Sequence, residues 1–115
     1  IRNTKVRLIS GNTQTTLKKF IKSKKKIDFI FIDGGHSVKT ILSDWENVKK
    51  IMSKKSIVIF DDYYDDTEII KKYGCNKIIN EIGDEFNFVI LKSTDFILYN
   101  KKKIKNSLVK VFYKN

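Results

Sequence analysis

Two mainly apolar runs, each ending in aspartate, limit the folds open to this chain more than any other feature. They are IDFIFID at residues 27–33 and SIVIFDD at residues 56–62. Continuous apolar runs of this length are typical of parallel strands that are buried on both faces of a sheet. We therefore predict two neighbouring central strands, each with carboxylates at its carboxyl end.

The segment between the two runs has the length and the pattern of a helix. Ser37 is suited to cap its amino end. Apolar residues recur at helical spacing and form one stripe: Val38, Ile41, Leu42, Trp45, Val48 and Met52. A strand, a helix and a second strand make a βαβ unit, in which the crossover is right-handed in nearly all known cases.

The rest of the chain adds shorter elements. They are a strand at 5–10, a helix after Asn12 and Thr13, two short helices ended by Gly74 and Gly83, strands at 86–92 and 107–114, and a brief strand at 96–100. No helical pattern of convincing length separates the last two long strands, so we expect them to pair antiparallel. The predicted fold class is α/β, with a mostly parallel sheet and an antiparallel C-terminal edge hairpin.

The amino-acid composition limits the classes of partner and the cellular locations that we expect for this protein. The net charge is +11, but of 24 basic residues only Arg2 and Arg7 are arginine, the residue favoured for paired contacts to phosphate and bases. Proline and alanine are missing while lysine, isoleucine and asparagine abound, which is typical of an AT-rich genome, so we do not expect a nucleic-acid partner.

The single cysteine, Cys75, fits a reducing compartment. No apolar run approaches the ~20 residues of a membrane span, and we expect a cytoplasmic protein without membrane contact.

Three carboxylates are expected to meet at one edge of the sheet. Asp33 ends the first apolar run, and Asp61 and Asp62 end the second; the ends of neighbouring strands lie only ~5 Å apart. Such a cluster repels itself unless a cation binds, and carboxylate oxygens with water suit Mg²⁺, with Ca²⁺ or Mn²⁺ as alternatives. An aspartate after a strand can also cap a helix or bind loop amides, but two acidic strand ends together favour a metal site.

The loop after the first run has the sequence GGHS at residues 34–37. Gly34 and Gly35 allow a ligand to approach the backbone closely. His36 is the only histidine; near neutral pH it can act as a general base or contact a cofactor, or it can make a structural hydrogen bond only. Both interpretations stay open at this point.

The stretch DFIFIDGGHSVKTILSDWENVKKIMSKKSIVIFDDYY, residues 28–64, resembles the second half of class I S-adenosylmethionine-dependent methyltransferases. The likeness is nearest to the small bacterial and macrocin-type sugar O-methyltransferases, whose strands end in I-D-G-x-H-S and in D-D or D-N plus an aromatic residue. RLISGNTQTTLKKF is similar to the family's third strand and the turn after it. The resemblance covers about residues 5–113 and implies a Rossmann-like sheet whose last four strands lie in the order fourth, fifth, seventh, sixth.

The resemblance implies a function and a role for each site residue. Asp33, Asp61 and Asp62 would hold a divalent metal, Mg²⁺ by preference, which chelates the acceptor and lowers the pKa of its hydroxyl group. Asp33 or His36 would be the catalytic residue that takes the proton. The turn at Asn12 and Thr13, and the loop residues Gly34 and His36, would contact S-adenosylmethionine. The expected enzyme methylates a hydroxyl of a small molecule, with sugar, catechol-like phenol and small metabolite all open, and the resemblance also allows a homodimer.

One departure from the family pattern shapes the domain prediction. The family's first strand with its acidic, glycine-rich turn is not found in this sequence, nor is the acid that ends the second strand and binds the ribose. We therefore interpret residues 1–115 as the C-terminal part of a single methyltransferase-like domain that lacks the first two strands. These residues alone are expected to bind the cofactor poorly and to be inactive.

Other function classes are weighed against this one. A non-catalytic methyltransferase-like module could bind nucleic acid or a protein partner through KSKKK at 22–26 and KKKIK at 101–105, provided that both cluster on one face. A response-regulator receiver would carry its paired acids before, not after, the lone aspartate. A haloacid-dehalogenase phosphatase needs an acid two residues before Asp33, where Phe31 stands.

Overall fold

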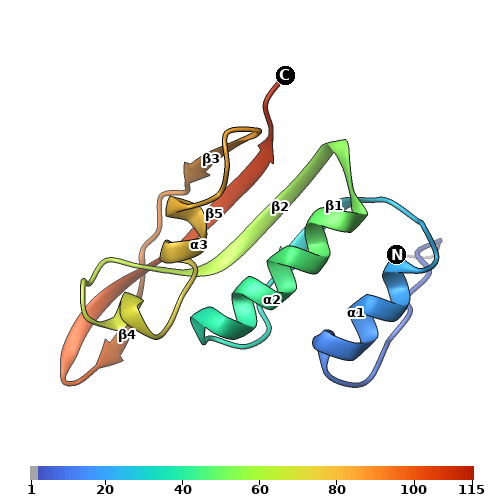
Figure 1. The fold of residues 1–115 in the computed structure, drawn as a ribbon. Helices are drawn as coiled ribbons and strands as arrows, with labels where there is room; N and C mark the ends of the chain where they lie inside the picture. Colours follow the sequence, from blue (N-terminus) through green and yellow to red (C-terminus); the bar gives the residue numbers. More distant parts are fainter. Residues whose placement is uncertain (1–2) are drawn as a thin grey trace.

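The computed structural model describes residues 3–115 (Figure 1); residues 1 and 2, which belong to the predicted domain, lie outside this range. Within it the α-helices are α1 at Thr13–Ile21, α2 at Val38–Val48 and α3 at Asn76–Asn80. The strands are β1 at Ile27–Ile32, β2 at Met52–Tyr64, β3 at Phe86–Ile90, β4 at Asp95–Tyr99 and β5 at Lys102–Tyr113. Two 3-10 turns, η1 and η2, span Lys49–Ile51 and Ile69–Lys71. No helix in the described range is long and apolar enough to cross a membrane.

The strands form one mixed sheet in the order β1-β2-β5-β3, and β4 pairs with the first half of β5. β1 and β2 are parallel neighbours, as predicted, with Ile30 opposite Val58. β5 is antiparallel to β2, β3 and β4. The predicted antiparallel pairing of the two long C-terminal strands is confirmed, with β3 at the edge of the sheet and paired with β5. β5 lies inside the sheet, with β2 on one side and β3 and β4 on the other. The order of β1, β2, β5 and β3 is the one that the resemblance implies.

The predicted strand at residues 5–10 is absent from the structure. This segment has no regular secondary structure, and Leu8 within it is 92% exposed. Among the described residues β1 pairs only with β2, so the other edge of β1 is free. A short strand without a partner cannot satisfy its backbone groups within a sheet, and the segment stays irregular instead.

Burial of β1 on both faces is also a prediction that the structure contradicts. Ile32 packs into the core and Ile30 against it, whereas Phe29 and Phe31 are 62% and 52% exposed. Side chains alternate between the faces of a strand, and α2 and α3 lie on the face that carries the core (Figure 1). The apolar residues of β1 therefore include one aromatic pair, Phe29 and Phe31, that is largely exposed among the described residues.

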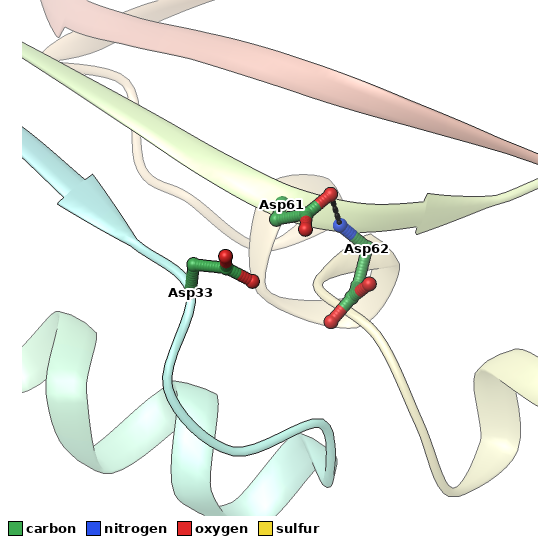
Figure 2. Close-up of side chains that lie close together, drawn as sticks. All are labelled: Asp33, Asp61 and Asp62. Atoms are coloured by element: carbon green, nitrogen blue, oxygen red, sulfur yellow. Dashed lines mark hydrogen bonds between the residues drawn. The ribbon is translucent and has the colours of Figure 1, made fainter. Parts of the chain in front are cut away.

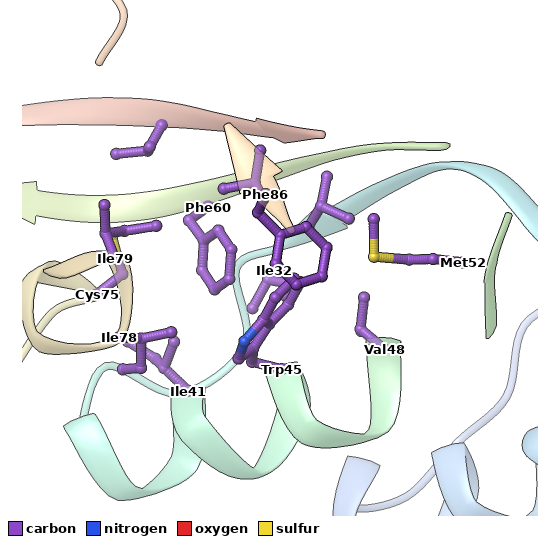
Figure 3. Packing of buried hydrophobic residues seen from close by; sticks show 13 residues of the cluster. Ile32, Ile41, Trp45, Val48, Met52, Phe60, Cys75, Ile78, Ile79 and Phe86 are labelled. Atoms are coloured by element: carbon purple, nitrogen blue, oxygen red, sulfur yellow. The ribbon is translucent and has the colours of Figure 1, made fainter. Parts of the chain in front are cut away.

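The core lies between α2, α3 and the sheet (Figure 3). The ring of Trp45 is its centre, with ring centroids 5.4 Å from Phe60 and 5.1 Å from Phe86. The predicted helix and its Ser37 cap are present, since the Ser37 hydroxyl accepts from the Thr40 N–H. The apolar stripe is wrong at two positions: Leu42 is 44% exposed, and Met52 lies beyond the end of α2, as the first residue of β2.

A smaller apolar cluster holds the C-terminal half together. Tyr64, Ile69 and Ile104 are its buried members. The brief predicted strand is confirmed as β4, but the first of the two predicted short helices is only the 3-10 turn η2. This cluster fixes the segment that follows β2 against the β4–β5 pair, and so it orients the end of β2.

Candidate metal and cofactor site

Three carboxylates meet where β1 and β2 end (Figure 2). Asp33 directly follows β1, and Asp61 and Asp62 lie near the end of β2. Each offers one oxygen, and these three oxygens lie within 4.8 Å of one another. The convergence predicted from the two apolar runs is thus present, and parallel pairing of the strands is its cause.

A β-bulge turns both acids of β2 toward Asp33. Phe60 pairs with Val109 and Tyr63 with Ser107, so Asp61 and Asp62 together lie opposite a single residue of β5. In a regular strand neighbouring side chains point to opposite faces, but a bulge bends the strand and redirects one of them. Asp62 takes the left-handed conformation, with φ of 67°, and its N–H donates to Asp61 Oδ1 at 2.8 Å.

His36 contacts the acidic cluster through Asp62. Its Nδ1 atom lies 2.6 Å from Asp62 Oδ2, while the His36 side chain is 65% exposed. Hydrogen bonding to Asp62 and attraction by its charge raise the pKa of His36. The second oxygen of Asp62 accepts a longer hydrogen bond of 3.4 Å from Asn106 Nδ2, so both oxygens of this buried carboxylate have partners.

Repulsion among the acids changes the ionisation of Asp33. Hydrogen bonding to the Asp61 carboxyl, then partial burial and the charges of Asp61 and Asp62, raise the pKa of Asp33, and His36 opposes the shift. A donor set made only of carboxylate oxygens is the kind that hard divalent cations prefer. The three residues therefore fit a cation such as Mg²⁺ by donor chemistry and by charge.

The four residues predicted to contact a cofactor lie at the start of α1 and in the loop after β1. Asn12 caps α1, since its Oδ1 accepts from the Gln14 N–H at 2.8 Å. The Thr13 hydroxyl donates to Asp44 Oδ1 at 2.6 Å. A Cβ at Gly34 would lie 3.4 Å from Asp44 Oδ2, so the turn at Thr13 and the loop at Gly34 meet on one carboxylate. His36 lies on the acidic side of the same loop.

A family model described as a methyltransferase domain matches residues 2–63, which is 62 of the 115 residues. The chain belongs to this methyltransferase domain family. The matched stretch contains every residue predicted for the site, from Asn12 to Asp62.

One similar solved structure is precorrin 8W decarboxylase from Methanobacterium thermoautotrophicum, with a TM-score of 0.51 and 14% sequence identity. The match covers 96% of this chain and 55% of that one, so this chain spans about half the length of its structural neighbour. At this identity the likeness concerns the fold alone. A search of the curated proteins found no match.

The methyltransferase domain has a cavity at the last residues of β2. Its volume is about 600 Å³, within the range of ~300–1,000 Å³ typical of small-molecule sites. Its walls include Tyr63, Asp65, Lys105 and Ser107, and Tyr63 directly follows Asp62 in β2. The cavity therefore lies along the last residues of β2 and offers an aromatic ring, an acidic group and a basic group, whereas Asp33, Asp61 and Asp62 are not part of its lining.

Sequence reasoning missed residues that support the site. Asp44 is buried on α2, and its signal was an acid within the apolar face of a helix. Asn76 binds the backbone of Tyr64 twice, accepting from its N–H at 3.0 Å and donating to its carbonyl at 2.9 Å. Asn106 has a buried Oδ1 without a partner among the described residues. No sequence pattern marked Asn76 or Asn106.

Cys75 is placed where it cannot serve as a nucleophile. It is fully buried in the core beside α3. Burial, followed by the charge of Asp62, raises the pKa of its thiol to about 12. The neutral, inaccessible thiol makes Cys75 a small packing residue of the core.

Proposed function

We propose that this methyltransferase domain transfers a methyl group from S-adenosylmethionine to a hydroxyl oxygen of a small molecule, assisted by a divalent cation. The observation that carries the proposal is the convergence of Asp33, Asp61 and Asp62 within 4.8 Å at the ends of two parallel strands. Ligands of open α/β sheets bind outside the carboxyl ends of the strands. Mg²⁺ is the first choice of cation, with Mn²⁺ and Ca²⁺ as alternatives.

The residues of the cluster divide the chemistry between them. A divalent cation bound there would lower the pKa of the acceptor hydroxyl. Asp33 or His36 accepts the hydroxyl proton, the acceptor oxygen forms a bond to the methyl carbon, and the bond between that carbon and the sulfonium sulfur breaks. Holding both substrates in line supplies a large part of the rate.

The cofactor side of the proposal rests on the two loops that meet at Asp44. Gly34 leaves room for a ligand beside the backbone, and the Asn12–Thr13 turn lies across from it through the 2.6 Å hydrogen bond of Thr13 to Asp44. His36 would then lie between the cofactor and the acceptor. The cavity lined by Tyr63 and Lys105 is the proposed acceptor site, for which a sugar, a phenol and a small polar metabolite all have suitable groups.

We further propose that these residues form part of a larger methyltransferase domain. Two observations support this: the match covers 55% of the solved structure, and the outer edge of β1 is free with Phe29 and Phe31 in solvent. A further strand beside β1 would pair with that edge. S-adenosylmethionine binding by the 115 residues alone is expected to be weak, and micromolar affinity in isothermal titration would contradict this part.

Metal binding tests the core of the proposal directly. Calorimetric titration with Mg²⁺ and Mn²⁺ should detect one site in the wild-type chain and none in the double variant Asp61→Asn/Asp62→Asn. The matched control is Asp65→Asn/Asp66→Asn, which removes the two acids next along the chain and should bind as wild type does. Equal binding by the Asp61/Asp62 variant would remove the metal from the proposal. In the complete protein, the same variant should lose metal-dependent methyl transfer from labelled S-adenosylmethionine.

A further inference from the structure

Gly74 lies between the two loops that carry the candidate metal site. Its N–H donates to the His36 carbonyl at 2.8 Å, and the next N–H, that of Cys75, donates to the Asp62 carbonyl at 3.0 Å. The Val38 N–H donates to the Lys72 carbonyl at 3.0 Å on the other side of the contact. Backbone groups at residues 72–75 therefore join the His36 loop to the bulge of β2.

The backbone hydrogen bonds at residues 72–75 hold Asp62 in an unfavourable backbone conformation. Asp62 has a φ of 67°, in the left-handed region, which aspartate tolerates better than most residues with a side chain but still adopts uncommonly. The Asp62 side chain is aimed at Asp33 and His36 only while that conformation lasts. The hydrogen bond from Cys75 to the Asp62 carbonyl is a direct restraint on it.

No side chain fits at position 74. A Cβ there would lie 2.5 Å from the Asp62 carbonyl oxygen and 2.6 Å from Cδ2 of the buried Tyr64 ring, and φ of Gly74 is +86°. The first of these atoms is backbone and the second belongs to a packed ring, so neither can move aside freely. Any side chain at this position would push directly on Asp62.

We propose that Gly74 is a positioning residue of the candidate metal site, which sets the positions of Asp62 and of His36 relative to each other. The inference rests on the proposed function for its metal, and on the contacts of Gly74 for its geometry. Gly74 contributes no ligand atom; its role is to let the 72–75 backbone approach the bulge. Replacing partners of this kind typically reduces metal affinity about 10- to 100-fold.

Gly83 provides a matched control for the test. Its φ is +99°, but a Cβ there would meet only the flexible end of the Glu85 side chain, at 2.8 Å from Oε2. Gly74→Ala and Gly83→Ala thus introduce the same left-handed strain at two places. By Mn²⁺ titration, Gly74→Ala should bind at least tenfold more weakly than wild type and Gly83→Ala within about twofold. Equal affinities of the two variants would overturn the inference.

A second variant at position 74 distinguishes the effect of backbone strain from the effect of the Cβ contact. Asparagine tolerates the left-handed region better than alanine does, so Gly74→Asn keeps the Cβ contact with less strain and should still lose affinity; full affinity would count against the inference. If neither variant folds, amide exchange in the wild-type chain decides. Gly74 and Cys75 N–H exchange should slow on addition of Mg²⁺, and unchanged rates would refute the restraint.

The test also distinguishes this inference from the proposed function. If the wild-type chain binds neither Mn²⁺ nor Mg²⁺, the metal assignment fails. In that case the position of Asp62 is monitored by the NMR chemical shifts of the His36 ring nitrogens at one fixed pH. If these chemical shifts change in Gly74→Ala but not in Gly83→Ala, the inference is supported. If they change in neither variant, the inference is overturned.

Discussion

The imidazole Nδ1 of His36 lies 2.6 Å from Asp62 Oδ2, although 26 residues separate the two in the chain. The loop after β1 and the bulge of β2 supply one residue each, and the contact exists only because the strands are parallel neighbours. An exposed histidine that touches a buried carboxylate is a group whose charge depends on the fold.

Stability should therefore respond to pH through His36. Its pKa is raised above the ordinary value of 6.5, so the folded chain binds this proton more tightly than the unfolded chain. The contribution is complete below that ordinary value and is lost as the pH rises through the folded pKa. The melting temperature should fall as the pH rises above about 6.5 in wild type, and less so in His36→Asn. An equal fall in both would contradict the assignment.

Removal of one acid from the cluster should stabilise the metal-free protein. Asp33→Asn relieves the repulsion by Asp61 and Asp62 that helps to raise the pKa of Asp33, and we expect a gain of up to about 1 kcal/mol in unfolding free energy, as is typical of exposed charges. Urea unfolding at neutral pH with a chelator measures it. Asp28→Asn, an exposed acid within β1, is the control and should leave stability unchanged. A loss of stability in Asp33→Asn would argue against a repulsive cluster.

Addition of Mg²⁺ should reverse that order. The cation binds the folded wild-type chain and stabilises it by about 2.7 kcal/mol at a concentration of one hundred times Kd. Asp33→Asn lacks one of the three ligands and should gain much less. Differential scanning fluorimetry with and without the metal compares the two chains. A shift of the same size in both would show that Asp33 does not bind the cation.

The backbone of the bulge predicts a difference between two substitutions of Asp62. Asparagine tolerates the positive φ of 67°, whereas valine is branched at Cβ and strongly disfavours it. Asp62→Val should therefore lose about 1–3 kcal/mol more unfolding free energy than Asp62→Asn. Trp45 fluorescence during urea unfolding follows the loss. Similar stabilities of the two variants would mean that the bulge relaxes at little cost.

The hydrogen bond between Thr13 and Asp44 should contribute to the stability of the α1–α2 contact. Thr13→Val removes the donor and leaves the buried Asp44 Oδ1 without it, a change that typically costs about 1–3 kcal/mol. Thr15→Val is the control, because Thr15 is an exposed residue of the same helix. Chemical unfolding of both variants measures the difference. Equal stabilities would exclude a role for this contact.

Packing around Trp45 predicts a large effect at one residue and a small one at another. Phe60 is fully buried against Trp45, and Phe60→Ala should destabilise the fold by about 3–5 kcal/mol. Leu42 belongs to the apolar pattern of α2 but lies 44% exposed, so Leu42→Ala should cost far less. Calorimetric melting of the two variants provides the comparison. A comparable loss at Leu42 would show that its side chain is covered in solution.

The sequence predicted what depends on local pattern. The apolar runs located β1 and β2, and the acids at their ends indicated a cluster that the structure forms from Asp33, Asp61 and Asp62. Features that depend on pairing between strands far apart in the sequence were not predicted. The bulge arises only from the register between β2 and β5, and the irregular course of residues 5–10 follows from a strand edge without a partner.

The basic clusters show the same limit. The alternative function, a module that binds a partner through one basic face, requires the lysines at 22–26 and 101–105 to lie close together. The first cluster follows α1, the second begins β5 beyond β4, and these elements lie at opposite ends of the molecule (Figure 1). Among the described residues, the two segments therefore do not share one basic surface. The sequence gives the charge of each segment but not the distance between them.

The bulge of β2 also constrains how the length of this chain can change. Deletion of one residue between Phe60 and Tyr63 would restore regular pairing with β5 and send the side chains of the remaining acid and of Tyr63 to opposite faces. An insertion there would shift Tyr64 and every later contact of β2 by one position. Substitutions can accumulate in this segment, but gains and losses of residues cannot, so the spacing from Phe60 to Tyr64 should be the most invariant length in related sequences.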